Sequence, residues 1–320
     1  MKKDFLFKNL IEALQDRIPQ RGKLADVLTD LLNIEKEAVY RRLRGSVPFS
    51  FLEVYAIATH FGFSLDSIAE NISPFTQQMT VLTVKFPNLQ ENDYRKMEDF
   101  IVSIRRLNRD DDSESGAISS IIPLSLSIVY KHIYKFYLYK WLHQLGNPQK
   151  IKTFEEADVT ERLKQINRDL VESVRESPKA VYILDRLFIK HFVNDVRFFF
   201  DIRLLTREDV LLLKDDLYLL IKDLEQYAIN GCFETGNKVE IFLANVHFDA
   251  NYSYIDDTSF KLTTTRFFAF SESYSSDEVI FQSMRNCMNF LKRTSTLISE
   301  GNATERILFF EQQRKLVDTM

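Results

Sequence analysis

The sequence predicts a mainly α protein, with an N-terminal domain of five short helices and a larger α+β domain. That second domain is predicted to be mostly helical, with a small antiparallel sheet. Apolar residues recur at helical spacing over most of the 320 residues. The chain has only 8 glycines and 7 prolines, and so few helix breakers favour helices over a many-turned β fold. The length and a change of pattern predict two domains, residues 1–75 and 76–320.

Five short helices joined by tight turns are predicted for the first domain, over residues 4–17, 23–32, 35–44, 50–61 and 64–72. Asn33 follows the second helix, and asparagine tolerates a left-handed backbone. Gly45 ends the third helix at the position where glycine is favoured. Ser50 and Glu53 have the spacing of a capping box at the start of the fourth helix.

The larger domain begins with a β-branched stretch, residues 79–86, which predicts a strand. A helix over 91–109 and an exposed acidic loop over 110–116 follow. The uncharged stretch 115–130 predicts a buried helix interrupted by Pro123. The longest later helices are predicted over residues 128–145, 182–200 and 207–229.

The pattern changes after residue 230, where β-branched and aromatic residues alternate with polar ones. We predict two or three strands there, within residues 239–248, 251–256 and 259–270. Two amphipathic helices, 275–299 and 303–319, close the chain, and they are the elements from which we expect a dimer to form.

Charge and cysteine content limit the classes of function. The net charge of −4 excludes a basic nucleic-acid coat, so any DNA contact must come from a local patch. Cys232 and Cys287 form no CxxC pair and no metal-binding spacing, which favours a reducing compartment. No uncharged stretch reaches the about 20 residues needed to span a bilayer, and the first residues do not have the pattern of a signal peptide. We therefore expect a cytoplasmic protein without membrane contact.

The third predicted helix, 35–44, has a polar, cationic side and an apolar side. Ala38, Val39 and Leu43 can face the domain core, which leaves the charged residues for solvent. The major groove of B-DNA is about 12 Å wide and admits one α-helix. The sequence "RRLR", residues 41–44, is also typical of a solvated helix C-terminus, where cations interact favourably with the helix dipole.

Residues 20–72 resemble the helix-turn-helix of the Xre/phage-repressor family. The resemblance rests on "DVLTDLLNIEKEAVYRRLRG" and on "SFLEVYAIATHFGFSLDSI", which follows it. The best matches are the "FGFSLDSI" segment and an apolar ladder formed by Leu28, Leu32, Ile34 and Val39. Two positions differ from the family pattern. Thr29 replaces a smaller residue within the second helix, and Asn33 replaces the glycine of the turn.

This resemblance implies that the third helix reads double-stranded DNA in the major groove. The implied base-edge contacts are Lys36, Glu37, Tyr40 and Arg41, and the implied phosphate contacts are Arg44 and Arg42. Proteins of this class bind two half-sites about 34 Å apart, which implies a homodimer. Residues 1–75 carry ten Lys+Arg and ten Asp+Glu, a net of 10 − 10 = 0, so electrostatic attraction to DNA is expected to be weak.

The larger domain carries no catalytic or dinucleotide-binding motif, so we expect no enzyme and no cofactor. Its histidines have neighbours that suggest metal binding or imidazole orientation, but ordinary hydrogen bonds are favoured, and no metal is expected. These groups are His132 with His143, His191 with Asp195, and His247 with Asp249, Asp256 and Asp257. The aromatic segment 130–141 is favoured as a packing face, although stacking on single-stranded nucleic acid is the alternative.

The sequence therefore favours a sequence-specific DNA-binding transcriptional regulator whose larger domain dimerises, responds to a small-molecule or protein effector, or does both. One alternative is a protein-interaction module whose helix-turn-helix does not bind DNA. The other is an enzyme of a class whose motifs we do not recognise.

Overall fold

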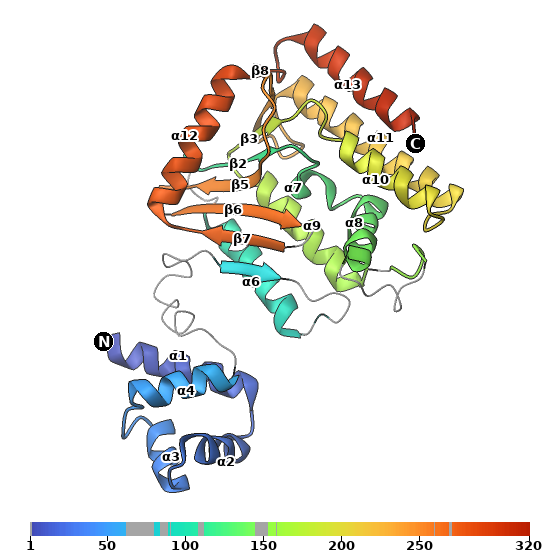
Figure 1. Ribbon diagram of the computed structural model, residues 1–320. Helices are drawn as coiled ribbons and strands as arrows, with labels where there is room; N and C mark the ends of the chain where they lie inside the picture. Colours follow the sequence, from blue (N-terminus) through green and yellow to red (C-terminus); the bar gives the residue numbers. More distant parts are fainter. Residues whose placement is uncertain are drawn as a thin grey trace. The chain divides into compact units, whose positions relative to one another are not determined.

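A computed structural model of the protein describes residues 2–61, 80–83, 89, 91–107, 112–144, 153–157, 159–258, 260–268 and 271–320 (Figure 1). The chain divides into two compact units, Met1–Gln77 and Gln78–Met320. This division lies close to the boundary expected at residue 75.

Unit 1 contains four described helices: α1 (Lys2–Arg17), α2 (Arg21–Leu32), α3 (Lys36–Leu43) and α4 (Phe51–Phe61). They match the first four predicted helices, whereas the fifth, 64–72, lies outside the described residues. All four helices contribute buried side chains to one apolar core. That core contains Leu10, Leu14, Leu24, Ala25, Leu28, Val39 and Ile57.

The turns of unit 1 have the backbone geometry that their residues predict. Asn33 ends α2 with φ 49° and ψ 49°, the left-handed conformation. Gly45 has φ 76°, and a Cβ atom there would lie 3.1 Å from the ring of Phe7. Only glycine tolerates both this backbone conformation and this close contact without strain, which explains why a glycine directly follows the arginines at the end of α3. The predicted capping box is confirmed: the Ser50 N–H donates to Glu53 at 2.7 Å, and the Glu53 N–H donates to Ser50 Oγ at 3.3 Å.

Unit 2 is built on a mixed eight-stranded sheet with the order β1-β7-β6-β5-β2-β3-β4-β8. The strands are β1 (Thr80–Thr83), β2 (Glu114–Ser119), β3 (Lys179–Leu184), β4 (Lys238–Leu243), β5 (Asn251–Asp256), β6 (Lys261–Phe268), β7 (Ser271–Ser275) and β8 (Thr296–Leu297). The prediction of a small antiparallel sheet is therefore wrong. β2, β3 and β4 are parallel neighbours, and the remaining pairs are antiparallel.

The sequence does not predict the parallel strands β2 and β3. The sequence predicts a loop followed by a buried helix over the residues of β2, and includes part of β3 in the helix 182–200. In each strand five consecutive residues are buried, so both faces of the sheet are covered at this point. A strand buried on both faces loses the alternation of apolar and polar residues that distinguishes a strand from a helix. β3, KAVYIL, is an apolar run, whereas β2, ESGAIS, consists mostly of small residues, and neither alternates.

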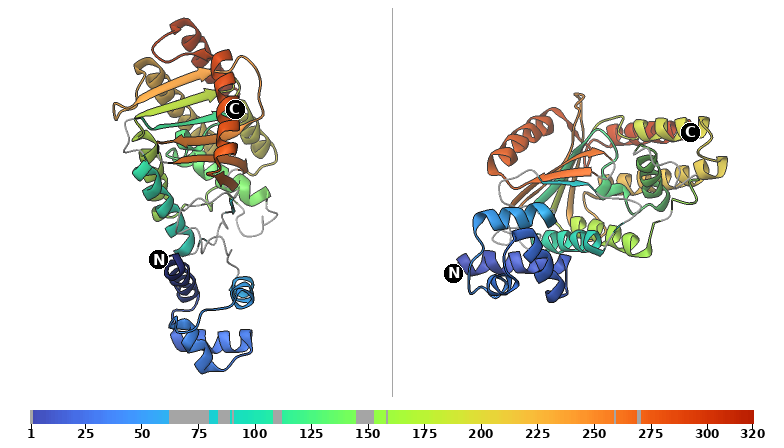
Figure 2. Two further views of the ribbon diagram at one scale, coloured as in Figure 1. Left: turned by 90° about the vertical axis from the view of Figure 1, so that its left-hand side faces the viewer. Right: turned by 60° about the horizontal axis from the view of Figure 1, so that its bottom comes forward.

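The described helices of unit 2 are α6 (Glu91–Leu107), α7 (Leu124–Ser127), α8 (Lys131–Gln144), α9 (Glu161–Arg175), α10 (Lys190–Asp201), α11 (Arg207–Asn230), α12 (Glu278–Thr294) and α13 (Ala303–Asp318). The prediction of a mainly α protein is confirmed. Helices α8, α9, α10, α11 and α13 bury one face of the sheet in the largest core. Helix α12 packs on the opposite face, in a smaller core with Phe281, Met288 and Leu291 (Figure 2). No helix among the described residues combines the length and apolarity needed to cross a membrane.

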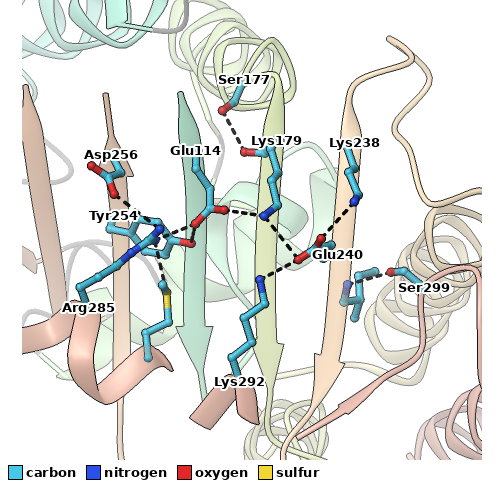
Figure 3. Close-up of polar contacts among 12 residues, drawn as sticks. Glu114, Ser177, Lys179, Lys238, Glu240, Tyr254, Asp256, Arg285, Lys292 and Ser299 are labelled. Carbon is cyan, nitrogen blue, oxygen red and sulfur yellow. Dashed lines mark hydrogen bonds and ion pairs between the residues drawn. The ribbon is translucent and has the colours of Figure 1, made fainter. Parts of the chain in front are cut away.

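An ionic network attaches α12 to the sheet (Figure 3). Glu114 accepts hydrogen bonds from the Tyr254 hydroxyl at 2.8 Å and from Arg285 Nη1 at 2.6 Å, and its second oxygen lies 2.7 Å from Lys179 Nζ. Burial alone would raise the pKa of Glu114. The hydrogen bonds from Lys179 and Arg285 outweigh that effect and lower the pKa to about 2. A charged carboxylate therefore fixes α12 across three strands.

Gly116 makes this network possible. A Cβ atom there would lie 2.4 Å from the Val181 carbonyl oxygen and 2.7 Å from the Tyr254 ring. Because the glycine has no side chain, the Tyr254 ring can cross β2 at close range and its hydroxyl can reach Glu114.

Candidate nucleic-acid interface

Helix α3 is held by its apolar side and presents its polar side outward, as predicted. Val39 is fully buried in the core of unit 1, and Leu43 packs half-buried beside it. Tyr40 differs from the expectation. It is also half-buried and packs against the same core, so only part of its side chain faces solvent.

Arg41 is an exposed arginine in the last turn of α3. Among the described residues, no carboxylate forms an ion pair with its guanidinium, and the residue is exposed. An unpaired, solvated guanidinium can bind the O6 and N7 atoms of guanine in a bidentate fashion without first breaking a protein contact. Arg41 is therefore the predicted contact residue with the best geometry for a nucleic acid.

Two other predicted contact residues are held in exposed ion pairs. Lys36 pairs with Asp26 of α2, and Arg44 Nη2 lies 3.0 Å from Glu37 Oε1 on the preceding turns of α3. The hydrogen bond with Asp26 raises the pKa of Lys36 above its ordinary value. Exposed pairs of this kind contribute little to stability because solvent screens them, so both cations can exchange their partner for a phosphate at little cost. In the described structure, Glu37 neutralises Arg44 rather than facing outward alone.

Arg42, an implied phosphate contact, lies in an ion pair within unit 1. Its Nη2 lies 2.9 Å from Glu53 Oε1, and its Nη1 donates to the Ala38 carbonyl at 3.3 Å. Burial would raise the pKa of Glu53, but hydrogen bonds from the Ser50 N–H and from Arg42 lower it. The sequence identified Glu53 only as a capping residue, and the spacing of one helix carries no signal for a contact with another.

Thr29, which stands where the family pattern has a smaller residue, also fits its environment in α2. Thr29 is half-buried on α2, and its Oγ1 donates to the Ala25 carbonyl at 2.8 Å. That bond satisfies the hydroxyl inside the helix, as threonine commonly does. A threonine therefore replaces the smaller family residue without an unpaired polar group.

The histidines of unit 2 make structural contacts. Asp216 of α11 accepts the backbone N–H groups of His132 and Ile133 at 2.6 and 3.2 Å, and His132 Nδ1 lies 3.2 Å from the same carboxylate. This carboxylate thus satisfies free N–H groups at the start of α8. His143 packs against the rings of Tyr139 and Phe199, and burial lowers its pKa.

The remaining acidic and histidine positions are not gathered into one site. Asp195 pairs with Lys140 and not with His191, and Asp256 pairs with Arg285 at 3.5 Å. His247 lies between two carboxylates, Asp185 at 3.1 Å and Asp249 at 3.2 Å. Within the described ranges, no group of three or more His, Cys, Asp and Glu side chains has an arrangement able to hold a metal ion.

Comparison with known proteins gives one result, and it concerns the N-terminal region. Residues 3–89 match the family model described as the BetR domain, a helix-turn-helix-like domain associated with DNA-binding regulators. The matched segment includes α1 to α4 and extends beyond unit 1 to include β1. Neither the curated proteins nor the solved structures gave a match to the chain. The N-terminal region thus has a regulatory helix-turn-helix-type domain.

Proposed function

We propose that the protein is a sequence-specific transcriptional regulator whose α3 is the recognition helix of an Xre/phage-repressor-type helix-turn-helix. One observation carries the proposal. Helix α3 buries Val39 in the core of unit 1 and presents the unpaired Arg41 on its solvent side. The match of residues 3–89 to a domain associated with DNA-binding regulators supports the same function.

The cations of α3 differ in their contacts within the protein, and we assign a different contact to each of them. Arg41 contacts a guanine edge, and Lys36, the first residue of the helix, makes a second base-edge contact. Arg44, at the end of the helix, contacts a phosphate after release from Glu37. Arg42 fixes α3 to α4 and therefore positions the other residues without touching DNA.

Unit 2 supplies dimerisation, effector binding or both. A symmetric pair of recognition helices is the usual way to read two half-sites one turn of DNA apart. The proposed effector is a small molecule or another protein, and the proposed location of the protein is the cytoplasm. No catalytic role or cofactor is part of this proposal.

The test is selection of bound sequences from a random DNA library with the full chain, followed by mobility-shift titration of the selected site. Arg41→Ala should weaken binding by about 1–3 kcal/mol, a factor of about 5–150, because a bidentate contact to guanine is lost. Lys8→Ala is the matched control, since Lys8 is an exposed cation of α1 in a pair with Glu12. Selection of no common sequence would contradict the proposal, as would equal affinity of the Arg41→Ala variant and the wild type.

A second candidate function is a protein-interaction module. Helix α4 exposes three large apolar side chains, Phe51 at 75 %, Leu52 at 77 % and Tyr55 at 57 %. Exposed apolar groups of this size are typical of protein-binding surfaces. Failure of DNA selection, together with loss of a co-purifying protein in a Leu52→Asp variant, would favour this function over the first.

A further inference from the structure

Two charged side chains of opposite sign lie next to each other on neighbouring strands of unit 2. Arg266 of β6 and Glu272 of β7 are direct cross-strand partners, so their side chains leave the same face of the sheet. The contacts of Arg266 identify that face. Its Nη2 donates to the Ile122 carbonyl at 3.0 Å, and its charge acts on Tyr137 of α8. Both of these residues belong to the largest core, so the two charges point towards the helices that cover it.

Neither charge has an ion-pair partner among the described residues. The guanidinium of Arg266 donates only to the Ile122 carbonyl, and the carboxylate of Glu272 has no hydrogen bond within the part of the chain that the structure describes. Asp195, the other carboxylate that acts on Tyr137, is already paired with Lys140. Because polar groups inside a domain are normally satisfied, two open charges side by side indicate a missing partner.

Both side chains lose hydration although each still reaches solvent. Arg266 and Glu272 are half-buried. Burial lowers the pKa of Arg266 and raises the pKa of Glu272, so in each case the protein disfavours the charged form. A molecule that brings an anion to the arginine and a cation to the glutamate would replace the interactions that both have lost.

Two tyrosines border these charges. Tyr137 is only 8 % exposed, and among the described residues no hydrogen bond reaches its hydroxyl. Burial raises the pKa of Tyr137 to about 12, and the charge of Arg266 acts in the opposite direction, which places the two groups near each other. Tyr274 lies two residues from Glu272 on the same face of β7, and its ring stacks on Phe100 of α6 with 6.3 Å between the ring centroids.

We propose that Arg266, Glu272 and Tyr137 form the effector site of unit 2, and that this site binds a free amino acid with an apolar side chain. The guanidinium donates to the α-carboxylate, whose geometry matches its planar fork. The α-ammonium donates to Glu272, and the Tyr137 hydroxyl donates to the carboxylate. The apolar side chain of the ligand lies against the tyrosine rings.

Charge complementarity selects this class of ligand. A zwitterion provides a partner for both charges of the site at once. A simple carboxylic acid would leave Glu272 without a partner, and a simple amine would leave Arg266 without one, and an unpaired charge in a partly buried place is unfavourable.

The inference deepens the proposed function, because it names the chemical class of the effector and rests on unit 2 having that role. Its test contains no DNA. A chain that binds an amino acid but selects no common DNA sequence would contradict the proposed function alone. A chain that selects a DNA sequence but binds no amino acid would contradict this inference alone.

Calorimetric titration of the full chain with each of the common L-amino acids is the first test. At least one amino acid with an apolar side chain should bind at millimolar or lower concentration. The matched control ligands are the deaminated acid and the decarboxylated amine of the best ligand, because each lacks one of its two charged groups. Both should bind at least about tenfold more weakly, since one charge of the site is then left unpaired. Binding of no amino acid overturns the inference, as does equal binding of either control ligand.

Substitutions then test the named side chains. Arg266→Gln and Glu272→Gln should each weaken binding by about tenfold or more, because each removes a charge-assisted hydrogen bond. Tyr137→Phe keeps the ring and removes only a neutral hydrogen bond, so it should weaken binding by about two- to tenfold. Arg293→Gln is the matched control, since Arg293 is an exposed arginine of α12, and it should bind like the wild type.

Thermal unfolding without ligand shows whether each variant is folded. Unchanged affinity of folded Arg266→Gln or Glu272→Gln overturns the inference, and so does a loss of binding in Arg293→Gln as large as theirs. If a charge variant does not fold, Tyr137→Phe and the two control ligands still decide, because they leave both charges of the protein in place.

Discussion

Arg42 of α3 and Glu53 of α4 form an ion pair with 2.9 Å between Nη2 and Oε1, and their side chains are only 19 % and 16 % exposed. The pair joins the recognition helix to the helix that follows it. Glu53 also accepts the N–H of Ser50, so one carboxylate caps α4 and holds α3. Two of the three arginines in the "RRLR" segment, Arg41 and Arg42, therefore have separate roles, and mutations should separate them.

Arg42→Ala should lower the free energy of unfolding of unit 1 by about 1–3 kcal/mol, because it leaves a covered carboxylate with one partner fewer. Arg41→Ala should change stability by less than about 0.5 kcal/mol, as expected at an exposed position without contacts. Chemical denaturation of both variants provides the measurement. A double-mutant cycle with Glu53→Gln isolates the pair, and a coupling energy near zero would show that Arg42 acts without Glu53.

The glycine behind the arginines offers a second test. Gly45→Ala forces a Cβ to within 3.1 Å of the Phe7 ring at φ 76°, and should destabilise unit 1 by about 1–2 kcal/mol. Gly22→Ala is the matched control, since Gly22 has open space around it in the first turn of α2. It should be neutral or stabilising by up to about 1 kcal/mol, because alanine favours a helix. Thermal denaturation of both variants provides the measurement. Equal effects of the two substitutions on stability would mean that the backbone at Gly45 is not constrained.

The structural features that the sequence predicts correctly are those that depend on residues close together in the chain. Asn33, Gly45 and the Ser50–Glu53 box each act within one turn of chain, and the structure has each where the sequence predicts it. The apolar side of α3 follows from spacing for the same reason. The contacts that set which cations of α3 are free, such as Arg42 with Glu53, join separate helices, so no local pattern encodes them.

Two central strands of the sheet in unit 2 could not be predicted from local sequence patterns. Gly116 in β2 and Tyr182 in β3 lie in strands covered on both faces, and their apolar neighbours lack a period of two. Strands are predicted from the sequence only at β1, β4, β5 and β6, where β-branched and aromatic residues are dense. The parallel pairing of β2 with β3 joins residues far apart in the sequence, such as Ala117 with Tyr182, and that pairing follows from the global fold rather than from any one segment.

Glu114 should make the free energy of unfolding of unit 2 decrease as the pH falls into the acid range. Its pKa is lowered from 4.5 to about 2 in the folded chain by Lys179 and Arg285 against the effect of burial. A lowered pKa in the folded state adds stability above pH 4.5, and this contribution is lost as the pH falls from 4.5 towards 2. Allowing for solvent screening, the contribution is about 2–3 kcal/mol.

Glu114→Gln should therefore lower stability at neutral pH and flatten its decline in acid. Denaturation midpoints measured from pH 7 to pH 2 provide the comparison. Asp249→Asn is a suitable control, because that carboxylate is 96 % exposed and lies outside the network. Parallel acid profiles of Glu114→Gln and the wild type would assign the acid sensitivity to other carboxylates.

Arg203→Gly tests the backbone strain that follows the end of α10. Glycine adopts φ 61° freely, whereas a side chain in the left-handed region costs about 1 kcal/mol or more. Because glycine also makes the unfolded chain more flexible, the net gain in monomer stability should be about 0.5–1 kcal/mol, measured by denaturation under dilute conditions. A variant that is less stable than the wild type would show that the Arg203 side chain supports the fold itself.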